Sequence, residues 1–494
     1  MEKTLKIYYT SDTHGYLFKS NNGSILQCIS EFKKDNNTLI IDGGDTIQGS
    51  PLLKYLWEND KFDKVIPKFF NLGKYDYYTL GNHDFNYGYD GLSKFVNAMN
   101  AKCIVCNVVD TSNKLKFDKY IIHTLENGLK IGITGAVTSW VNVWEPASNL
   151  ENLIIEDTFS SLKETFEIMK DKCDIKICIY HGGYEEDLKT KELLKHTDEN
   201  IACKISRELD FDLLLTGHQH AKIENTTIYN THTVQPPSNA SMYIKVDLIK
   251  SEDSLEINSK LIKPSENILD SLLKVSEPIK EESDKWLLKQ IGNLKEEVPF
   301  LEKIDMAVNG SKIADLNNLV QLDATNADIS CTSLHNAPIN LPKKITVSDV
   351  LRVMPYPNEV IVKEISGQTL LNALKRSASY FDIKDNKVIV SKKFLIPKEE
   401  HYNYDYFANV EYSVDLNTKE IYGVFIKGEK LDLKKMYTIA MSDYRATGTG
   451  GYDDYKTSKV IMTHNKDMQQ LLMNYLQKNI NLEIPSLSKI NIKK

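Results

Sequence analysis

The chain has 494 residues, of which 41% are hydrophobic and 26% charged, and its formal net charge is −7. This length exceeds what one ordinary core accommodates and predicts two domains, while the mixed charges leave no basic stripe for a nucleic-acid backbone. No apolar run approaches the ~18 residues of a membrane span, and the seven scattered cysteines do not form the pattern of a disulfide framework. Because no apolar signal segment follows the charged first residues, we expect a cytoplasmic protein.

The first part of the chain alternates between short apolar runs typical of strands and amphipathic runs typical of helices. Expected strands cover residues 5–10, 38–41, 75–80, 103–109, 131–137, 175–180, 213–216, 226–230, 243–248 and 254–261. Expected helices cover residues 24–34, 51–57, 64–72, 92–99 and 159–169, with helical material within 186–209. This alternation predicts an α/β sandwich.

The character of the chain changes after residue 262. The next 35 residues or so are rich in Lys, Glu and Ser, with apolar residues at helical spacing from Ile268 to Ile291, and they predict a helical linker. A second, smaller domain follows, with expected elements at residues 317–325, 328–340, 347–358, 359–365, 367–380 and 402–426. We therefore expect three parts, covering residues 1–262, 263–298 and 299–494.

Polar side chains follow five of the expected strands. Asp12 and His14 come after the first strand, Asp45 after the second, Asn82 and His83 after the third, His181 after the strand at 175–180, and His218 and His220 after the strand at 213–216. Open α/β sheets bind their ligands beyond the carboxyl ends of strands. We therefore expect these side chains to form one site.

Seven of these residues offer oxygen or imidazole donors: Asp12, His14, Asp45, Asn82, His181, His218 and His220. A two-metal centre needs about seven or eight donors, including a shared carboxylate. The absence of thiolates favours Mn²⁺, Fe²⁺, Co²⁺ or Zn²⁺ over a closed structural zinc site. Each motif alone is also compatible with a polar loop or a hydrogen-bonded core histidine, but the whole set in this order favours two divalent ions.

The order D-x-H, G-D, G-N-H-D, H-G-G, G-H-x-H resembles the calcineurin-like metallophosphoesterases. Residues 349–360, 366–368, 402–405 and 443–452 resemble the C-terminal domain of bacterial 5′-nucleotidases and 2′,3′-cyclic-nucleotide 2′-phosphodiesterases/3′-nucleotidases. The resemblance implies an N-terminal four-layer α/β/β/α metallophosphatase sandwich, a helical linker and a smaller C-terminal α+β substrate-binding domain.

The resemblance also implies roles for the donors. One metal would be held by Asp12, His14, Asp45 and His220, and the other by Asp45, Asn82, His181 and His218, with Asp45 as the bridge. The metals would lower the pKa of a water molecule that attacks phosphorus. His83 would face the phosphoryl group and stabilise the transition state or assist the leaving oxygen.

Asn86 departs from the 5′-nucleotidase pattern, which has an aspartate beside the catalytic histidine. An asparagine can orient His83 through a hydrogen bond, but it cannot raise the pKa of His83 as a carboxylate would. The departure resembles the cyclic-phosphodiesterase branch, as does His220 in place of a glutamine. On this reasoning, Asn86→Asp should raise monoester hydrolysis.

Aromatic side chains of the second domain are candidates for stacking on a nucleobase. The resemblance favours Tyr402 and Tyr452, with Tyr404 as a substitute, although each tyrosine is equally compatible with a packing role. Arg445, one of only four arginines in the chain, would anchor phosphate or ribose, or would bond the loop carbonyls. Asn336 is a further candidate for substrate contact.

These patterns predict a dinuclear-metal hydrolase of nucleotide phosphoesters, namely a 2′,3′-cyclic-nucleotide 2′-phosphodiesterase with 3′- or 5′-nucleotidase activity. Two alternatives stay open: a plain 5′-nucleotidase, and a catalytically silent nucleotide-binding protein. The expected partner is a nucleotide substrate. We expect no nucleic-acid duplex, membrane or protein partner.

Overall fold

A computed structural model describes residues 2–194, 197–337, 339–396 and 398–493. The chain divides into two compact units, Met1–Asp284 and Lys285–Lys494. Among the described residues, no helix combines the length and the apolar character needed to cross a membrane. The three-part division expected from the sequence stays a prediction.

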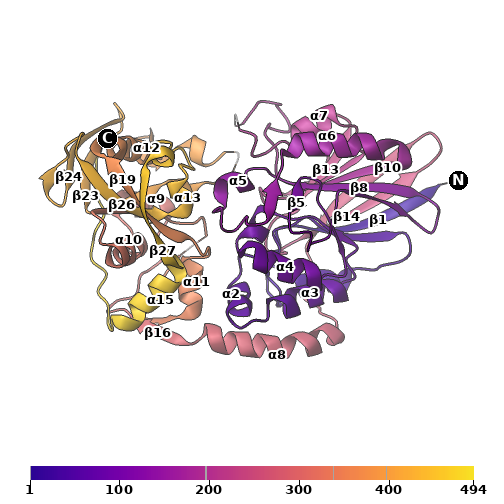
Figure 1. The fold of residues 1–494 in the computed structure, drawn as a ribbon, viewed down its shortest axis with the longest axis horizontal. Coiled ribbons are helices and arrows are strands. Elements are labelled where there is room, and N and C mark those ends of the chain that lie inside the picture. The colour runs from indigo at the N-terminus through magenta and orange to yellow at the C-terminus, as the bar shows by residue number, and fades with distance from the viewer. Residues whose placement is uncertain (1, 195–196, 338, 397, 494) are drawn as a thin grey trace. The chain divides into compact units, whose positions relative to one another are not determined.

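Two sheets form the centre of the first unit (Figure 1). The seven-stranded sheet has the order β15-β14-β1-β2-β3-β4-β6, with bounds Leu255–Ile262, Tyr243–Lys250, Lys3–Thr10, Thr38–Asp42, Tyr77–Tyr78, Lys102–Ile104 and Phe117–Asp118. The six-stranded sheet has the order β12-β13-β11-β10-β8-β7, with bounds Ile223–Ile228, Thr231–Gln235, Leu213–Thr216, Ile175–His181, Lys130–Val137 and Tyr120–Thr124. A separate pair joins β5 (Val108–Asp110) to β9 (Leu153–Ile155).

The two sheets pack face to face. Ile7 and Ile41 of the first sheet share one buried cluster with Ile133, Ile177 and Leu215 of the second. Burying one such side chain stabilises the fold by roughly 1.5–3 kcal/mol. Because both faces of the central strands are covered, these strands are apolar almost throughout, as parallel sheets require.

Helices cover the outer face of each sheet. Their bounds are α1 Ile25–Glu31, α2 Pro51–Glu58, α3 Phe62–Leu72, α4 Gly88–Ala98, α5 Val141–Trp144, α6 Thr158–Met169 and α7 Ala202–Glu208, with short 3₁₀ turns η1 Asn82–Phe85 and η2 Lys170–Lys172. Figure 1 shows α6 and α7 on one side and α3 and α4 on the other. Phe166 of α6 shares a core with Cys178 of β10, and Phe95 of α4 packs edge-on against Tyr78 of β3 at 5.6 Å. The expected four-layer α/β/β/α sandwich is confirmed.

Parallel pairing aligns the strands that precede the polar motifs. In the first sheet β1 pairs with β2 and β2 with β3, all parallel, and in the second sheet β10 pairs in parallel with β11. The carboxyl ends of parallel strands meet at one edge of each sheet. The loops after these strands are therefore gathered together by the fold.

The second unit is an α+β domain that begins within helix α8 (Asp270–Leu287). Its five-stranded sheet has the order β22-β17-β26-β19-β27, with bounds Asp405–Ala408, Ile329–Ser333, Met436–Ser442, Glu359–Ser366 and Lys459–Asp467. Its four-stranded sheet has the order β25-β24-β23-β28, with bounds Glu429–Lys430, Glu420–Ile426, Val410–Asp415 and Lys489–Lys493. Two small pairs are β16 Gln290–Asn293 with β18 Lys344–Thr346, and β20 Phe381–Lys384 with β21 Lys387–Val390.

The helices of this unit are α9 Lys303–Asn309, α10 Lys312–Thr325, α11 Val347–Val353, α12 Gly367–Ala378, α13 Asp443–Ala446, α14 Asp454–Thr457 and α15 Met468–Lys478, with 3₁₀ turns η3 Lys392–Phe394 and η4 His401–Asn403. Two hydrophobic clusters flank the five-stranded sheet. One contains Val362 and Ala440 with Leu316 of α10, and the other contains Ile361 and Ile439. Alternate residues of β19 and β26 thus enter opposite cores, as the strand repeat dictates.

Three expected elements differ from the structure. The apolar run 103–109 is two strands, because Cys106 donates its N–H to Gly135 and leaves the first sheet after β4. Helix within 186–209 is confined, among its described residues, to α7, whose first turn is capped by the carboxylate of Glu185 at 3.0 Å from Cys203 N. Ile291, part of the predicted helical linker, lies in strand β16.

Candidate functional site

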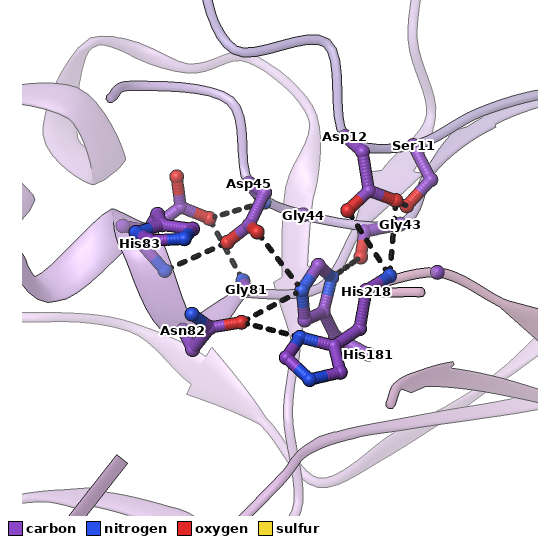
Figure 2. Close-up of polar contacts among 12 residues, drawn as sticks. Ser11, Asp12, Gly43, Gly44, Asp45, Gly81, Asn82, His83, His181 and His218 are labelled. Carbon is purple, nitrogen blue, oxygen red and sulfur yellow. Dashed lines mark hydrogen bonds and ion pairs between the residues drawn. The ribbon is translucent and has the colours of Figure 1, made fainter. Parts of the chain in front are cut away.

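The structure brings together all seven expected donors of the first unit. Six lie in loops or turns after β1, β2, β3 and β11, and His181 is the last residue of β10. Figure 2 shows Asp12, Asp45, Asn82, His181 and His218 turned toward one another. All the donors except His220, with a side chain 37% exposed, are at least 94% buried.

The backbone at these positions adopts an unusual conformation. The φ angles of Asp12, His14, Asp45, His218 and His220 are 53°, 49°, 56°, 72° and 57°. Residues with a Cβ rarely enter this left-handed region, and such strain persists only where the surrounding structure holds it. Backbone bonds supply that support, since Asp12 N donates to Gly44 O and His14 N to Asp45 O, both at 2.9 Å.

Two imidazole rings are oriented by backbone carbonyls. His14 donates its Nδ1–H to Gln48 O at 2.8 Å, and His181 donates its Nδ1–H to Gly43 O at 2.7 Å. Each bond turns the Nε2 atom toward the cluster, as in metal sites where a second partner fixes the ligating nitrogen. Burial, opposed by Asp45, lowers the pKa of His14 to about 4, so its ring is neutral near pH 7.

A first group of donors contains Asp12, His14 and His220, whose ligand atoms lie within 4.8 Å of one another. The Nε2 atoms of His14 and His220 face each other at 3.3 Å. His220 Nε2 also lies 3.3 Å from Asp12 Oδ1. Donors bound at about 2.0–2.2 Å to one ion are themselves about 3 Å apart, so this spacing fits one shared cation.

A second group contains Asp12, Asp45 and His181. His181 Nε2 lies 3.2 Å from Asp45 Oδ2 and 3.2 Å from Asn82 Oδ1. The same Asn82 oxygen lies 2.9 Å from His218 Nδ1. Burial disfavours a charge on His181, yet the carboxylates of Asp45 and then Asp12 raise its pKa to about 10. The surroundings of this group therefore favour a positive charge.

The donor chemistry fits a cation for a second reason. His218 donates its Nε2–H to Glu199 Oε1 at 3.1 Å, which leaves a lone pair on Nδ1 in the neutral ring. That lone pair faces the Asn82 carbonyl oxygen, itself an acceptor. Acceptors that face one another across about 3 Å repel unless a cation lies between them. The two groups share Asp12, and the bridging role expected for Asp45 stays a prediction.

His83 stands beside the cluster and belongs to neither group. Its backbone N–H donates to Asp45 Oδ1 at 2.7 Å, and its ring lies 5.7 Å from the ring of His14. Its Nδ1–H donates to Asn86 Oδ1 at 2.8 Å, the bond that the sequence predicted. Asn86 in turn donates its amide N–H to Glu145.

Three supporting carboxylates were not identified from the sequence. Glu145 and Glu199 hold Asn86 and His218, and Asp84 accepts backbone N–H bonds from Gly81, Asp45, Thr46 and Ile47 at 2.8–3.0 Å. Glu145 and Glu199 lie in loops without a recognisable motif. Asp84 lies inside the G-N-H-D motif, and its place in that motif could have identified it as a supporting residue from the sequence.

The tyrosines of the second unit differ in exposure. Tyr452 is 3% exposed, with its ring between Tyr455, stacked at 5.8 Å, and the Arg445 guanidinium at 4.1 Å. Tyr404 is also 3% exposed and packs against Tyr380. Tyr452 and Tyr404 therefore offer no open face for a nucleobase, which corrects the expectation for both.

Tyr402 is half-buried, and its ring lies beside Tyr444 rather than beside Tyr452, the partner expected from the sequence. Its ring lies 6.3 Å from the ring of Tyr444, also half-buried, at an interplanar angle of 75°. Tyr444 was missed because 443–452 contains two tyrosines, and only packing distinguishes Tyr444 from Tyr452.

Arg445 and Asn336 support loops. Arg445 is 2% exposed, lies 2.8–2.9 Å from both carboxylate oxygens of Asp405, and donates to the carbonyls of Thr449 and Tyr402. Of the two roles left open for Arg445, the structure favours bonding of loop carbonyls. Asn336 donates to Glu399 O at 2.7 Å and accepts from His401 N at 3.1 Å, so it braces the segment before Tyr402.

Comparison with known proteins agrees with this geometry. The family model for calcineurin-like phosphoesterases matches residues 5–222, and that for the 5′-nucleotidase C-terminal domain matches residues 290–457. The chain belongs to the calcineurin-like phosphoesterases that carry a 5′-nucleotidase C-terminal domain. The expected family is confirmed, and with it a phosphoester hydrolase that depends on divalent metal ions.

Individual relatives of this phosphoesterase are distant. It is 24% identical to the trifunctional nucleotide phosphoesterase protein YfkN of Bacillus subtilis over 92% of the chain, but it spans only 36% of that protein. It is 24% identical to the 2′,3′-cyclic-nucleotide 2′-phosphodiesterase/3′-nucleotidase of Salmonella typhimurium, over 83% of this chain and 74% of that one. A solved structure from Staphylococcus aureus, named as a 5′-nucleotidase candidate and bound to alpha-ketoglutarate, matches with a TM-score of 0.93 and 28% identity over all of both chains.

Proposed function

We propose that this phosphoesterase is a dinuclear-metal hydrolase of nucleotide phosphoesters, with 2′,3′-cyclic-nucleotide 2′-phosphodiesterase and nucleotidase activity. The observation that carries the proposal is the set of seven donors, six of them buried, whose nitrogen and oxygen atoms lie about 3 Å apart. The names of the relatives from Bacillus subtilis and Salmonella typhimurium favour nucleotides over other phosphoesters.

In this proposal the donors divide as the family resemblance implies. Asp12, His14, Asp45 and His220 hold one ion and Asp45, Asn82, His181 and His218 the other, and Mn²⁺, Zn²⁺, Fe²⁺ and Co²⁺ are all compatible with such ligands. When bound, the ions supply a water of lowered pKa and neutralise charge on the phosphoryl oxygens. The protein supplies fixed ligand geometry, because backbone carbonyls and carboxylates orient the rings of His14, His181 and His218.

His83 is the proposed catalytic residue that is not a ligand, with Asn86 as its partner. The backbone of His83 is tied to Asp45 and its Nδ1 to Asn86. The opposite edge of the ring, which carries Nε2, is then turned away from Asn86 and is the edge proposed to face a phosphoryl oxygen. A positioned histidine of this kind contributes roughly 10²–10⁴-fold to rate.

For the second unit we propose that Tyr402 and Tyr444 form the surface on which a nucleobase stacks. Both are half-buried and adjacent, whereas Tyr404 and Tyr452 are covered. Stacking on an aromatic ring contributes about 1–3 kcal/mol per base, and it is tolerant of base identity.

The test is phosphate release with Mn²⁺ from a matched panel: 2′,3′-cyclic AMP with a coupled monoesterase, 3′-AMP, 5′-AMP and bis-p-nitrophenyl phosphate. Each assay is repeated with His83→Ala, whose metal content is measured in parallel. We expect cyclic and 3′ substrates to be preferred, and His83→Ala to lower kcat by about 100-fold or more at unchanged metal content.

Two outcomes would replace the proposal. Preference for 5′-AMP would make the protein a plain 5′-nucleotidase, a possibility favoured by the structural match from Staphylococcus aureus. Less than one metal per chain after reconstitution, with no turnover on any substrate, would make it a silent nucleotide-binding protein.

A further inference from the structure

A chain of three side chains runs from His83 through Asn86 to the carboxylate of Glu145. His83 Nδ1–H donates to Asn86 Oδ1 at 2.8 Å, and Asn86 Nδ2–H donates to Glu145 Oε1 at 2.5 Å. The other Glu145 oxygen accepts from Asn149 Nδ2 at 2.8 Å. Both oxygens of Glu145 are thus held by amides.

Glu145 is placed firmly by its own backbone. It follows helix α5 (Val141–Trp144), and its N–H closes the last turn by donating to Val141 O at 2.9 Å. Asn149 also reaches Asn86, with Nδ2 lying 3.4 Å from the Asn86 carbonyl oxygen. The loop after α5 therefore contacts Asn86 at both its side chain and its backbone.

The carboxylate decides which way the Asn86 amide points. An asparagine side chain can present either its oxygen or its NH₂ group to a neighbour, whereas an ionised carboxylate only accepts. With NH₂ facing Glu145, the oxygen must face His83, and His83 must carry its proton on Nδ1. The reversed amide would set the Asn86 oxygen against the carboxylate and would place the imidazole proton on the opposite nitrogen.

We propose that Glu145 is a positioning residue of this site: it fixes the Asn86 amide and, through it, the ring orientation and tautomer of His83. The proposal rests on the proposed function, in which His83 acts on the phosphoryl group. Glu145 thus orients His83 through Asn86, whereas an aspartate in place of Asn86 would orient His83 directly.

This arrangement reverses the expectation for Asn86→Asp. From the sequence alone, that substitution should raise monoester hydrolysis. In the structure it places a second carboxylate against Glu145, and like charges at that distance disfavour each other. Glu145→Gln removes the repulsion, because in the double variant the glutamine amide can donate to the newly introduced carboxylate. The double variant then has the acid at position 86 and the amide at position 145, which is the reverse of the wild type.

The experiment compares kcat and KM of the wild type, Asn86→Asp, Glu145→Gln and the double variant on the best substrate of the panel. Loss of a supporting partner of this type costs about 10–100-fold in activity. We expect Asn86→Asp to lose about that much, Glu145→Gln to lower kcat in the wild-type background, and the same Glu145→Gln to raise kcat about tenfold or more in the Asn86→Asp background. Glu151→Gln, on an exposed residue of the same loop, is the matched control and should change neither constant.

If Glu145 acted only in folding, Glu145→Gln would not lower kcat in the wild-type background and raise kcat in the Asn86→Asp background. If Glu145→Gln lowered kcat in both backgrounds, the proposal would be overturned. Metal content and unfolding midpoints of all variants accompany the kinetics, so that loss of ions or of folded protein is not mistaken for loss of orientation.

A second measurement does not depend on turnover or on the folding of Asn86→Asp. The ring nitrogens of His83 are observed by NMR in protein labelled with ¹⁵N-histidine and are identified by their loss in His83→Ala. We expect the Nδ1–H tautomer in the wild type and a mixture of tautomers in Glu145→Ala. An unchanged tautomer in Glu145→Ala would overturn the proposal. If the wild type hydrolyses nothing in the panel, the proposed function fails while the NMR result still decides the role of Glu145.

Discussion

The donor cluster of the first unit and the tyrosine loop of the second both bury charged side chains, but they balance that charge in opposite ways. In the cluster, imidazole nitrogens lie 2.9–3.3 Å from one another or from the Asn82 carbonyl oxygen. In the tyrosine loop, Arg445 is paired with Asp405 and shared among backbone carbonyls. The first arrangement fits an external cation, whereas in the second the protein itself supplies the opposite charge.

This difference distinguishes a ligand-binding site from a structural ion pair. Buried acceptors without a donor between them are costly, and a fold retains them where a ligand supplies the missing charge. In a buried ion pair each charge is already balanced by its partner, and removing one partner leaves an uncompensated charge. Four substitutions test this distinction.

The largest effect is expected from Asp45→Asn. Asp45 faces His181 and accepts the backbone N–H of His83, so the substitution alters the candidate cation site and the hydrogen bond that holds His83. Loss of several kcal/mol of metal-dependent stabilisation corresponds to about a 1,000-fold fall in kcat. Activity and metal content by mass spectrometry should fall together. His123→Gln, on a half-buried histidine bonded to Tyr77, should retain both. An Asp45→Asn enzyme with full metal content and full rate would contradict the assignment of this cluster as a cation site.

Arg445→Met should destabilise the second unit rather than weaken substrate binding. It leaves Asp405 buried without its partner, which costs about 3–5 kcal/mol. Urea unfolding measures the change. The exposed pair Lys295–Glu483, whose side chains are 58% and 73% exposed, is the control, because breaking it by Glu483→Gln should cost less than about 1 kcal/mol. A normal unfolding curve with a raised KM would instead assign Arg445 to the ligand.

Asp84→Asn tests the support beneath the donor cluster. The Asp84 carboxylate accepts four backbone N–H bonds, three of them from Asp45, Thr46 and Ile47 in the loop after β2. An amide in its place directs an NH₂ group at some of those donors, and each buried donor left unsatisfied costs about 1–3 kcal/mol. We expect unfolding free energy to fall by about 2–4 kcal/mol on that scale, and metal content to fall with it. Asp90→Asn, on the exposed face of α4, provides the comparison, and equal stability of the two variants would refute the role of Asp84.

The smallest effect is expected at the stacking surface. Tyr444→Ala should raise KM for nucleotides about 5- to 150-fold, the range that corresponds to about 1–3 kcal/mol of stacking, with little change in kcat. Tyr452→Phe keeps the ring between Tyr455 and Arg445 and removes only the bond from its hydroxyl to Asn403 O, so its KM should match the wild type. If Tyr452→Phe raised KM and Tyr444→Ala did not, the assignment of the two tyrosines would be reversed.

Local sequence patterns were sufficient to predict the sandwich, the family and the seven positions that the fold brings together. Apolar runs mark strands through local periodicity, and D-x-H, G-N-H-D, H-G-G and G-H-x-H place donors just beyond those strands, where parallel pairing then gathers them. These signals are local in the chain, because each donor is positioned by the strand that precedes it.

Contacts between residues distant in sequence show which carboxylates support the donors and how deeply each tyrosine ring is buried. Glu145 and Asn86 are 59 residues apart, and Arg445 and Asp405 are 40 residues apart, so no local pattern marks either contact. Tyr402, Tyr404, Tyr444 and Tyr452 lie in equally polar segments, and their exposure depends on what packs over each ring. Hydrogen-bond polarity and burial depend on pairs distant in sequence, which is why the proposals for Glu145 and Tyr444 rest on the fold.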